Sequence, residues 1–201
     1  MKIHGTAKGG AISKKDFGVA FGGDAVVEVC ATTLAWDESS TAEMAALYAG
    51  NLRTIQGAII KDGSDFEDQN LKTATFYIKK QGTPEGTIYC KLYTSAVVDP
   101  AASLGSVIET SSNYYQMDDA EWSDGDHEFT FSGDNDISVG NALVIFCTFT
   151  GGSSETDYIV CVCRFDTDDN TESMRQYQKG DEDAKWEGQA NINPRFKVCN
   201  T

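Results

Sequence analysis

Alternation of apolar and polar residues recurs along the chain after residue 52 and predicts β-strands rather than helices. The clearest example is 71–80, LKTATFYIKK, in which Ala74, Phe76 and Ile78 lie on one side of the expected strand. A turn rich in Gly and Pro follows at 81–86, and 87–95, TIYCKLYTS, has the pattern of a returning strand. These features predict a β-hairpin over 71–95.

Other strand-like segments are separated by turns rich in Gly, Asp and Asn. They are 25–36, 54–60, the end of 97–112, 127–133, the apolar strand within 134–152, its expected hairpin partner 156–166, and 194–200. The segment 167–189 is polar and is predicted to be a loop. Eight to ten short strands at regular spacing are typical of an antiparallel sandwich or jelly roll.

A single short helix is predicted at about 41–49. Ser40 and Glu43 have the spacing of a capping box, and Gly50 would end the helix. The alternative is a helical turn that leads into a strand. The predicted fold is therefore all-β: one antiparallel β-sandwich (jelly roll) over 24–201, with an extended N-terminal arm at 1–23 and at most one short helix.

The apolar run at 142–149 is too short to span a bilayer as a helix, so we expect no membrane insertion. The N-terminus lacks the apolar stretch of a classical signal peptide. We expect a virion or extracellular surface location, reached without such a peptide.

Charge is unevenly placed along the chain. The formal net charge is −15, yet residues 1–15 contain four lysines and no acid. An acidic body repels phosphate at long range, which argues against nucleic acid as the main partner.

Six cysteines stand at positions 30, 90, 147, 161, 163 and 199. On a strand, Cys161 and Cys163 would point to the same face, and Cys147 on the preceding apolar strand could face one of them. The sequence leaves two alternatives open: buried thiols that act as small apolar side chains, or one or two disulfides, with Cys147, Cys161 and Cys163 as candidates.

Several short segments within residues 54–200 resemble segments of a known type of domain. They are the turn glycines and proline Gly82, Pro84 and Gly86, the pair Leu92 and Tyr93, the segments ASLGSV and HEFTFSGDNDISVGNALVIFC, and the closing YQKGDEDAKWEG and PRFKV. In this order they resemble choice-of-anchor β-sandwich domains, which are similar to carbohydrate-binding-module jelly rolls. The cysteines, the long acidic turns and the first 50 residues depart from that pattern.

The resemblance implies a non-enzymatic surface module that binds glycans or other protein subunits. The sequence supports the absence of catalysis independently, because it has two histidines and none of the common nucleophile or metalloprotease motifs. We expect that the protein requires no cofactor. Calcium is a candidate ligand, because acidic turns supply hard oxygen atoms; Asp134, Asp136, Asp166 and Asp168 are the candidate ligands.

A glycan site needs aromatic platforms with polar neighbours. Tyr114, Tyr115 and Trp122 lie in loop-like stretches and are the candidates. The alternative is that Trp186 and the tyrosines seal the edges of the sandwich core.

The arm is the preferred functional segment at this stage. Its glycines disfavour independent folding, so we expect it to be ordered by contact with its own body or a neighbouring subunit. The candidate subunit-contact residues are Lys2, Lys8, Ile12, Lys14, Lys15, Phe17, Val19 and Phe21. The leading hypothesis is a structural subunit of a virion, tail or extracellular filament that assembles with itself. The alternative is a carbohydrate-binding or adhesin module that recognises a cell-surface glycan.

Overall fold

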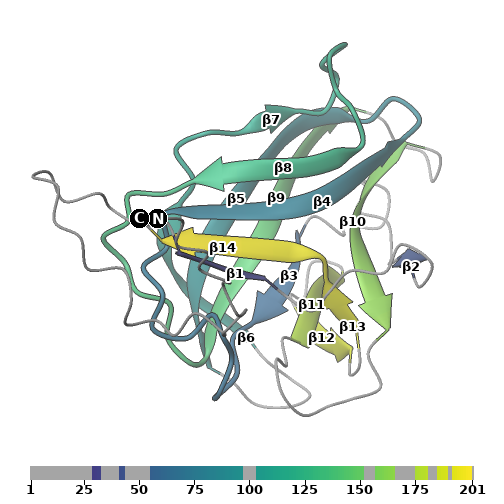
Figure 1. Cartoon of the computed structure of the whole chain (residues 1–201). Helices are drawn as coiled ribbons and strands as arrows, with labels where there is room; N and C mark the ends of the chain where they lie inside the picture. The colour runs from purple at the N-terminus through teal and green to yellow at the C-terminus, as the bar shows by residue number, and fades with distance from the viewer. Residues whose placement is uncertain are drawn as a thin grey trace, which may run out of the picture.

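The structure is a computed structural model of the 201-residue chain. It describes residues 29–32, 41–43, 55–96, 103–151, 157–165, 175–180, 185–189 and 192–200. Two antiparallel sheets pack face to face over these residues, and they contain no helix, hence none that is long and apolar enough to cross a membrane (Figure 1). The all-β sandwich predicted from the strand pattern is confirmed.

The first sheet is built around β4 (Thr73–Gln81). One edge of β4 pairs with β8 (Gly125–Thr130), and the other edge is shared by β14 (Phe196–Asn200) and β10 (Tyr158–Phe165). Three short strands complete the sheet: β1 (Val29–Thr32) beside β14, and β2 (Thr41–Glu43) and β13 (Ile192–Pro194) beside β10.

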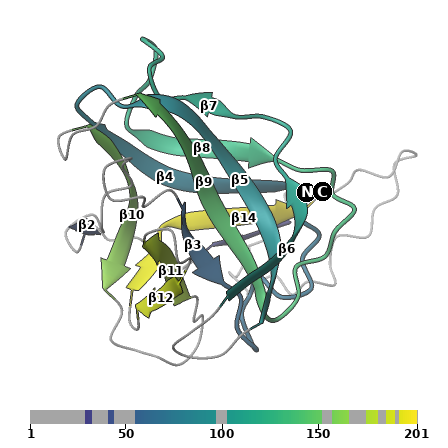
Figure 2. The same cartoon turned by 180° about the vertical axis from the view of Figure 1, so that it is seen from behind.

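The second sheet follows the order β12-β11-β3-β9-β5-β6 (Figure 2). Its long central strands are β9 (Asn141–Gly151) and β5 (Glu85–Ala96). The other members are β12 (Lys185–Gln189), β11 (Arg175–Gly180), β3 (Ile55–Ile59), β6 (Ser103–Thr110) and β7 (Tyr115–Gln116), which pairs with β5 at its edge.

Alternate residues of facing strands fill the space between the sheets. Phe76 and Ile78 on β4 and Ile88 and Leu92 on β5 are completely buried in one continuous cluster. The period-2 pattern of the sequence thus becomes a two-layer core, because successive side chains of a strand point to opposite faces.

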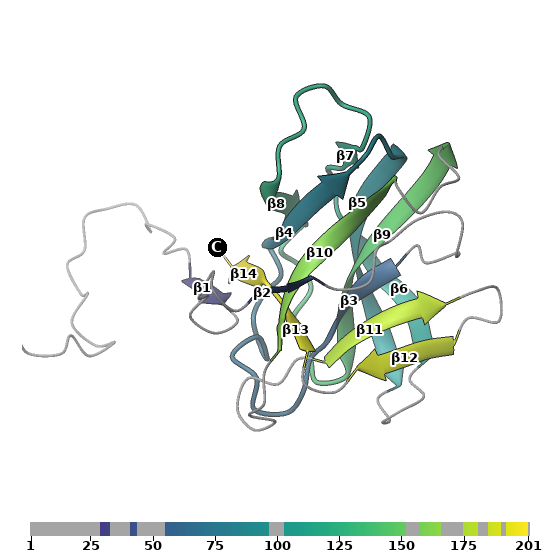
Figure 3. The same cartoon turned by 90° about the vertical axis from the view of Figure 1, so that its right-hand side faces the viewer.

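The two hairpins predicted from the sequence are wrong. β4 and β5 are consecutive strands, but β4 lies in the first sheet and β5 in the second. The strands β9 and β10 are separated in the same way. The Gly-Pro turn after β4 therefore carries the chain across the sandwich, which Figure 3 shows in side view. Both arrangements bury one face of each strand, so alternation alone does not distinguish a hairpin from a crossover.

Local assignments also change in two segments. Thr41–Glu43, the expected start of a helix, forms β2 and pairs with Val162–Arg164 of β10. Ladder hydrogen bonds to β10 there outweigh the weak capping signal. The polar segment predicted as a loop contains β11 and β12, because β11 pairs with β3 and covers that edge of the sheet. Residues 44–49 lie outside the described part.

Both alternatives left open for the cysteines occur, at different positions. Cys30 and Cys199 lie directly opposite each other on β1 and β14 and form a disulfide. Cys147 and Cys161, expected as disulfide candidates, are buried thiols on opposite sheets. Sequence reasoning missed the bonded pair because it connects positions 169 residues apart. Cys163 belongs to β10, and its side chain lies outside the described part.

The arm at 1–23, its eight candidate contact residues and the boundary at residue 24 lie outside the described residues. The expected arm contact and the division at residue 24 therefore stay predictions.

Candidate functional site

At one end of the sandwich, the residues that immediately precede β7 of the second sheet form hydrogen bonds to β8 of the first sheet. The amide of Ser112 donates to the carbonyl of Thr130 at 2.8 Å. The side chain of Asn113 accepts from the amide of Thr130 at 2.7 Å and donates to the carbonyl of Glu128, also at 2.7 Å. Asn113 thus replaces a backbone partner for β8, which fixes the position of the residues that follow.

The loop at 117–124 closes over this edge and is anchored to β4 by Lys80. The ammonium of Lys80 donates to the carbonyl of Met117, and its backbone amide donates to Asp124 Oδ1, both at 2.9 Å. The amide of Met117 donates to the carbonyl of Gly86 at 2.8 Å. Both ends of the loop are therefore tied to the strands that flank it.

An aromatic cluster lies beneath the loop. The ring of Tyr115 makes edge contacts with Trp122, His127 and Phe129, with centroid distances of 6.4, 4.7 and 5.3 Å. The Tyr115 hydroxyl donates to the carbonyl of Glu128 at 2.7 Å. Tyr115 and Trp122 are half-buried against the core. Tyr115 therefore helps to seal the open end of the sandwich, as the alternative interpretation of the tyrosines proposes, and Trp122 packs beside it.

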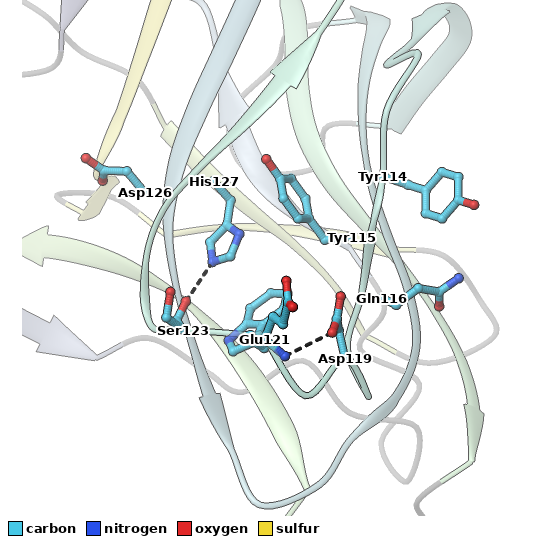
Figure 4. Close-up of a pocket in the computed structure, with 9 residues that line it drawn as sticks. Tyr114, Tyr115, Gln116, Asp119, Glu121, Ser123, Asp126 and His127 are labelled. Atoms are coloured by element: carbon cyan, nitrogen blue, oxygen red, sulfur yellow. Dashed lines mark hydrogen bonds between the residues drawn. The ribbon is translucent and has the colours of Figure 1, made fainter.

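His127 completes the cluster from β8. Its ring stacks on Trp122, and its Nε2 donates to the carbonyl of Ser123 at 3.1 Å (Figure 4). Burial lowers the pKa of His127 below its ordinary value, although the Ser123 carbonyl and the charges of Asp124 and Asp126 act in the opposite direction. The neutral imidazole is thus the form that this packing favours.

Trp122 has a buried polar atom that makes no hydrogen bond within the described residues. Its Nε1 is buried without an acceptor among the residues that the structure describes. Lys80 Nζ lies 5.7 Å from the centroid of the indole ring. The ring is therefore partly covered by protein contacts, and its remaining surface belongs to the lining of the pocket described next.

A pocket of about 640 Å³ opens beside this cluster. Its lining combines aromatic rings with hydrogen-bonding and acidic side chains: Tyr114, Tyr115, Gln116, Asp119, Glu121, Trp122, Ser123, Asp126 and His127. In Figure 4, Tyr115 and His127 face each other, whereas Tyr114 points to the other side of its strand. Tyr114 is 52% exposed, so it is an open aromatic residue at the rim of the pocket rather than a ring that faces the interior of the pocket.

The structure brings the three predicted glycan-binding residues to one pocket but gives them different surroundings. Tyr115 and Trp122 pack into the core edge, and Tyr114 stays open to solvent. Sequence reasoning missed His127, Asp119 and Glu121, because their proximity depends on how the loop folds back over β8. The signal that was available is the dense run of acids around Trp122 in DDAEWSDGDH.

The calcium candidates do not come together in the described part. Asp134 and Asp136 are both exposed, and the described residues contain no group of three or more acidic, histidine or cysteine side chains placed to hold a metal ion. Asp166 and Asp168 lie outside that part. Calcium binding therefore stays a prediction.

Comparison with known proteins gives little further identification. No protein-family model and no curated protein matches the chain. Among solved structures, the fold is similar to the crystal structure of the cysteine protease and lectin-like domains of Cwp84, a surface layer associated protein of Clostridium difficile, with 12% identity and a TM-score of 0.45. The match covers 82% of this chain and 36% of that one, so the chain spans about a third of its length.

Proposed function

We propose that this protein is a non-enzymatic carbohydrate-binding module that acts at a cell or virus surface through the pocket beside Tyr114. The observation that carries the proposal is the exposed Tyr114 ring at the rim of a pocket that polar side chains line. A sugar has apolar C–H faces and many hydroxyls, so it needs an aromatic surface together with converging hydrogen-bond groups.

The polar groups of the pocket suit hydroxyl recognition. The carboxylates of Asp119, Glu121 and Asp126 accept hydrogen bonds, and the amide of Gln116 both donates and accepts them. The loop that presents Asp119 and Glu121 is tied at Met117 by Lys80 and Gly86, and at Asp124 by the backbone amide of Lys80. Such anchoring reduces the conformational entropy that binding costs.

Two further observations support the proposal: one favours binding over catalysis, and the other favours a location outside the cell. The imidazole of His127 is engaged by the Ser123 carbonyl and by the face of Trp122, so it does not act as an open general base. The disulfide between Cys30 and Cys199 is a bond that persists in oxidising compartments. An extracellular surface location and a glycan partner follow as parts of the same proposal.

A glycan array tests the proposal with three proteins: the native chain, Tyr114→Ala and Val139→Ala. Val139 is 44% exposed and does not line the pocket, so Val139→Ala removes exposed apolar surface elsewhere. We expect array signals that Val139→Ala retains and Tyr114→Ala loses, with unchanged thermal unfolding in both variants. A silent array contradicts the proposed function, and signals that survive Tyr114→Ala contradict the proposed site.

The assembly hypothesis depends on the arm at 1–23, which lies outside the described residues. It stays a prediction that arm deletion and sedimentation can test. No described contact favours it over glycan binding.

A further inference from the structure

A row of three aromatic rings extends from the pocket rim onto the outer face of the second sheet. Tyr89 on β5 pairs directly with Phe146 on β9. The ring of Tyr114 lies 5.5 Å from the ring of Tyr89, on the side away from β9. Neighbouring strands are about 4.8 Å apart, so the row crosses two strand spacings.

The register places this row on the outside of the sandwich. Ile88, Cys90 and Leu92 of β5 are buried in the central core, so Tyr89 and Lys91 between them project outward. Tyr89 and Phe146 are half-buried, and Tyr114 is the most open of the three rings. Tyr114 and Tyr89 therefore present ring surface to solvent next to the pocket, whereas Phe146 packs against a buried cluster on the same face that contains Tyr93 and Val144.

Lys91 adds a positive charge to this row. It follows Tyr89 by two residues on the same face, about 7 Å along the strand. Its Nζ lies 4.1 Å from the centroid of Phe146, which holds the ammonium beside the aromatic row. Its partners in register, Thr110 on β6 and Val144 on β9, are uncharged, and no carboxylate among the described residues pairs with Lys91.

The two sides of Tyr114 consequently differ in charge. The pocket on one side contains the carboxylates of Asp119, Glu121 and Asp126. The sheet face on the other side has the ammonium of Lys91 beside Tyr89. A ligand that spans both sides contacts hydrogen-bond acceptors in the pocket and the ammonium of Lys91 on the sheet face. This arrangement favours a ligand that carries hydrogen-bond donors at one end and a negative charge at the other.

We propose that the ligand is a linear saccharide that contains an acidic sugar unit. The acidic unit stacks on Tyr114 and Tyr89 with its carboxylate toward Lys91, and an uncharged neighbouring unit occupies the pocket. This proposal rests on the carbohydrate-binding function proposed above and specifies the class of ligand. The lysine is the group that would discriminate acidic from neutral chains.

Titration calorimetry with two tetrasaccharides of equal length tests this specificity. One alternates glucuronic acid with N-acetylglucosamine, and the other contains N-acetylglucosamine alone. We expect the acidic chain to bind the native protein about threefold or more tightly at low ionic strength, as one partly exposed ion pair allows. The advantage should shrink at high salt, because salt screens exposed charges.

Substitutions at Lys91 separate charge from packing. Lys91→Gln should abolish the advantage of the acidic chain, and Lys91→Arg should retain it. Lys197→Gln is the matched control, because Lys197 lies on β14 of the opposite sheet and the substitution changes net charge equally. Circular dichroism melts establish that all three variants fold.

The outcomes for the two proposals are distinct. If both tetrasaccharides bind equally and Lys91→Gln has no effect, the acidic-ligand proposal is overturned while carbohydrate binding stands. If neither tetrasaccharide binds, the acidic-ligand proposal is also overturned, and the glycan array with Tyr114→Ala decides the broader function independently.

Discussion

The imidazole ring of His127 lies flat against the indole ring of Trp122, with centroids 4.3 Å apart and an interplanar angle of 22°. One ring comes from β8 of the first sheet, and the other comes from the loop at 117–124, which contributes to the lining of the pocket. The stack therefore attaches the loop to the sandwich through an imidazole whose pKa burial lowers below the ordinary value.

The first prediction concerns the pH dependence of stability. Burial depresses the pKa of His127 in the folded state below its unfolded value of about 6.5. Between these two values the unfolded chain binds more protons, so the free energy of unfolding should fall as pH decreases from about 6.5 through the folded pKa. Urea titrations at a series of pH values measure this slope.

Two variants assign the effect to its source. His127→Gln should flatten the slope in that window, and His4→Gln, which alters the only other histidine of the chain, should leave it unchanged. An identical slope in native protein and His127→Gln would falsify the assignment.

The second prediction concerns the disulfide between Cys30 and Cys199. Because the bond joins positions 169 residues apart, it restricts the unfolded chain strongly. We expect Cys30→Ala to lower the free energy of unfolding by about 2–5 kcal/mol. Reductant should lower the stability of the native protein to that of the variant and leave the variant unaffected. Equal stability of both proteins under oxidising conditions would contradict this role.

The third prediction concerns Gly86, whose carbonyl anchors the loop at Met117. Its φ is +123°, and a Cβ atom there would collide with the backbone of Thr148. Gly86→Ala should therefore cost about 2 kcal/mol or more and disturb Trp122 fluorescence as the loop shifts.

Gly63→Ala is the control for this substitution. Gly63 also has a positive φ, at +78°, but nothing lies within 4 Å of its Cβ position. Its cost should be near 1 kcal/mol, with Trp122 fluorescence unchanged. Similar effects of both substitutions would show that close approach to Thr148 is not limiting.

The fourth prediction concerns the core thiols. Burial raises the pKa of Cys90 and Cys147 well above the ordinary thiol value, and Cys161 nearby acts in the same direction. Both thiols should resist iodoacetamide in the native protein and react once guanidinium unfolds it, because only the thiolate is nucleophilic. Peptide mapping by mass spectrometry reads the labelling, and rapid native labelling at either position would refute the assignment.

Much of the fold could be predicted from local pattern. The alternation in 71–80 and in 127–133 reflects one buried and one exposed face, and those segments form β4 and β8. That property belongs to each strand separately, so it survives whichever partner the strand takes. Short strands with weaker alternation, such as β7 and β13, escaped prediction because pairing rather than pattern holds them.

The candidate site shows a similar division. Tyr114, Tyr115 and Trp122 stood out as aromatics in polar, loop-like sequence, and the structure places all three at one pocket. Which ring is buried and which is open could not be predicted. That outcome depends on the pairing of Asn113 with β8 and of Lys80 with the loop, contacts between residues 15 to 44 positions apart.

The sequence by itself determined that this chain forms short amphipathic strands, an acidic body and an aromatic-rich turn before β8. Tertiary structure alone decided that β4 and β5 enter opposite sheets, that Cys30 bonds Cys199, and that Tyr114 faces outward beside Tyr89. The physical reason is that a strand's pattern records which of its faces is buried but not what buries it. Partners are selected by packing and hydrogen bonding between segments distant in the chain.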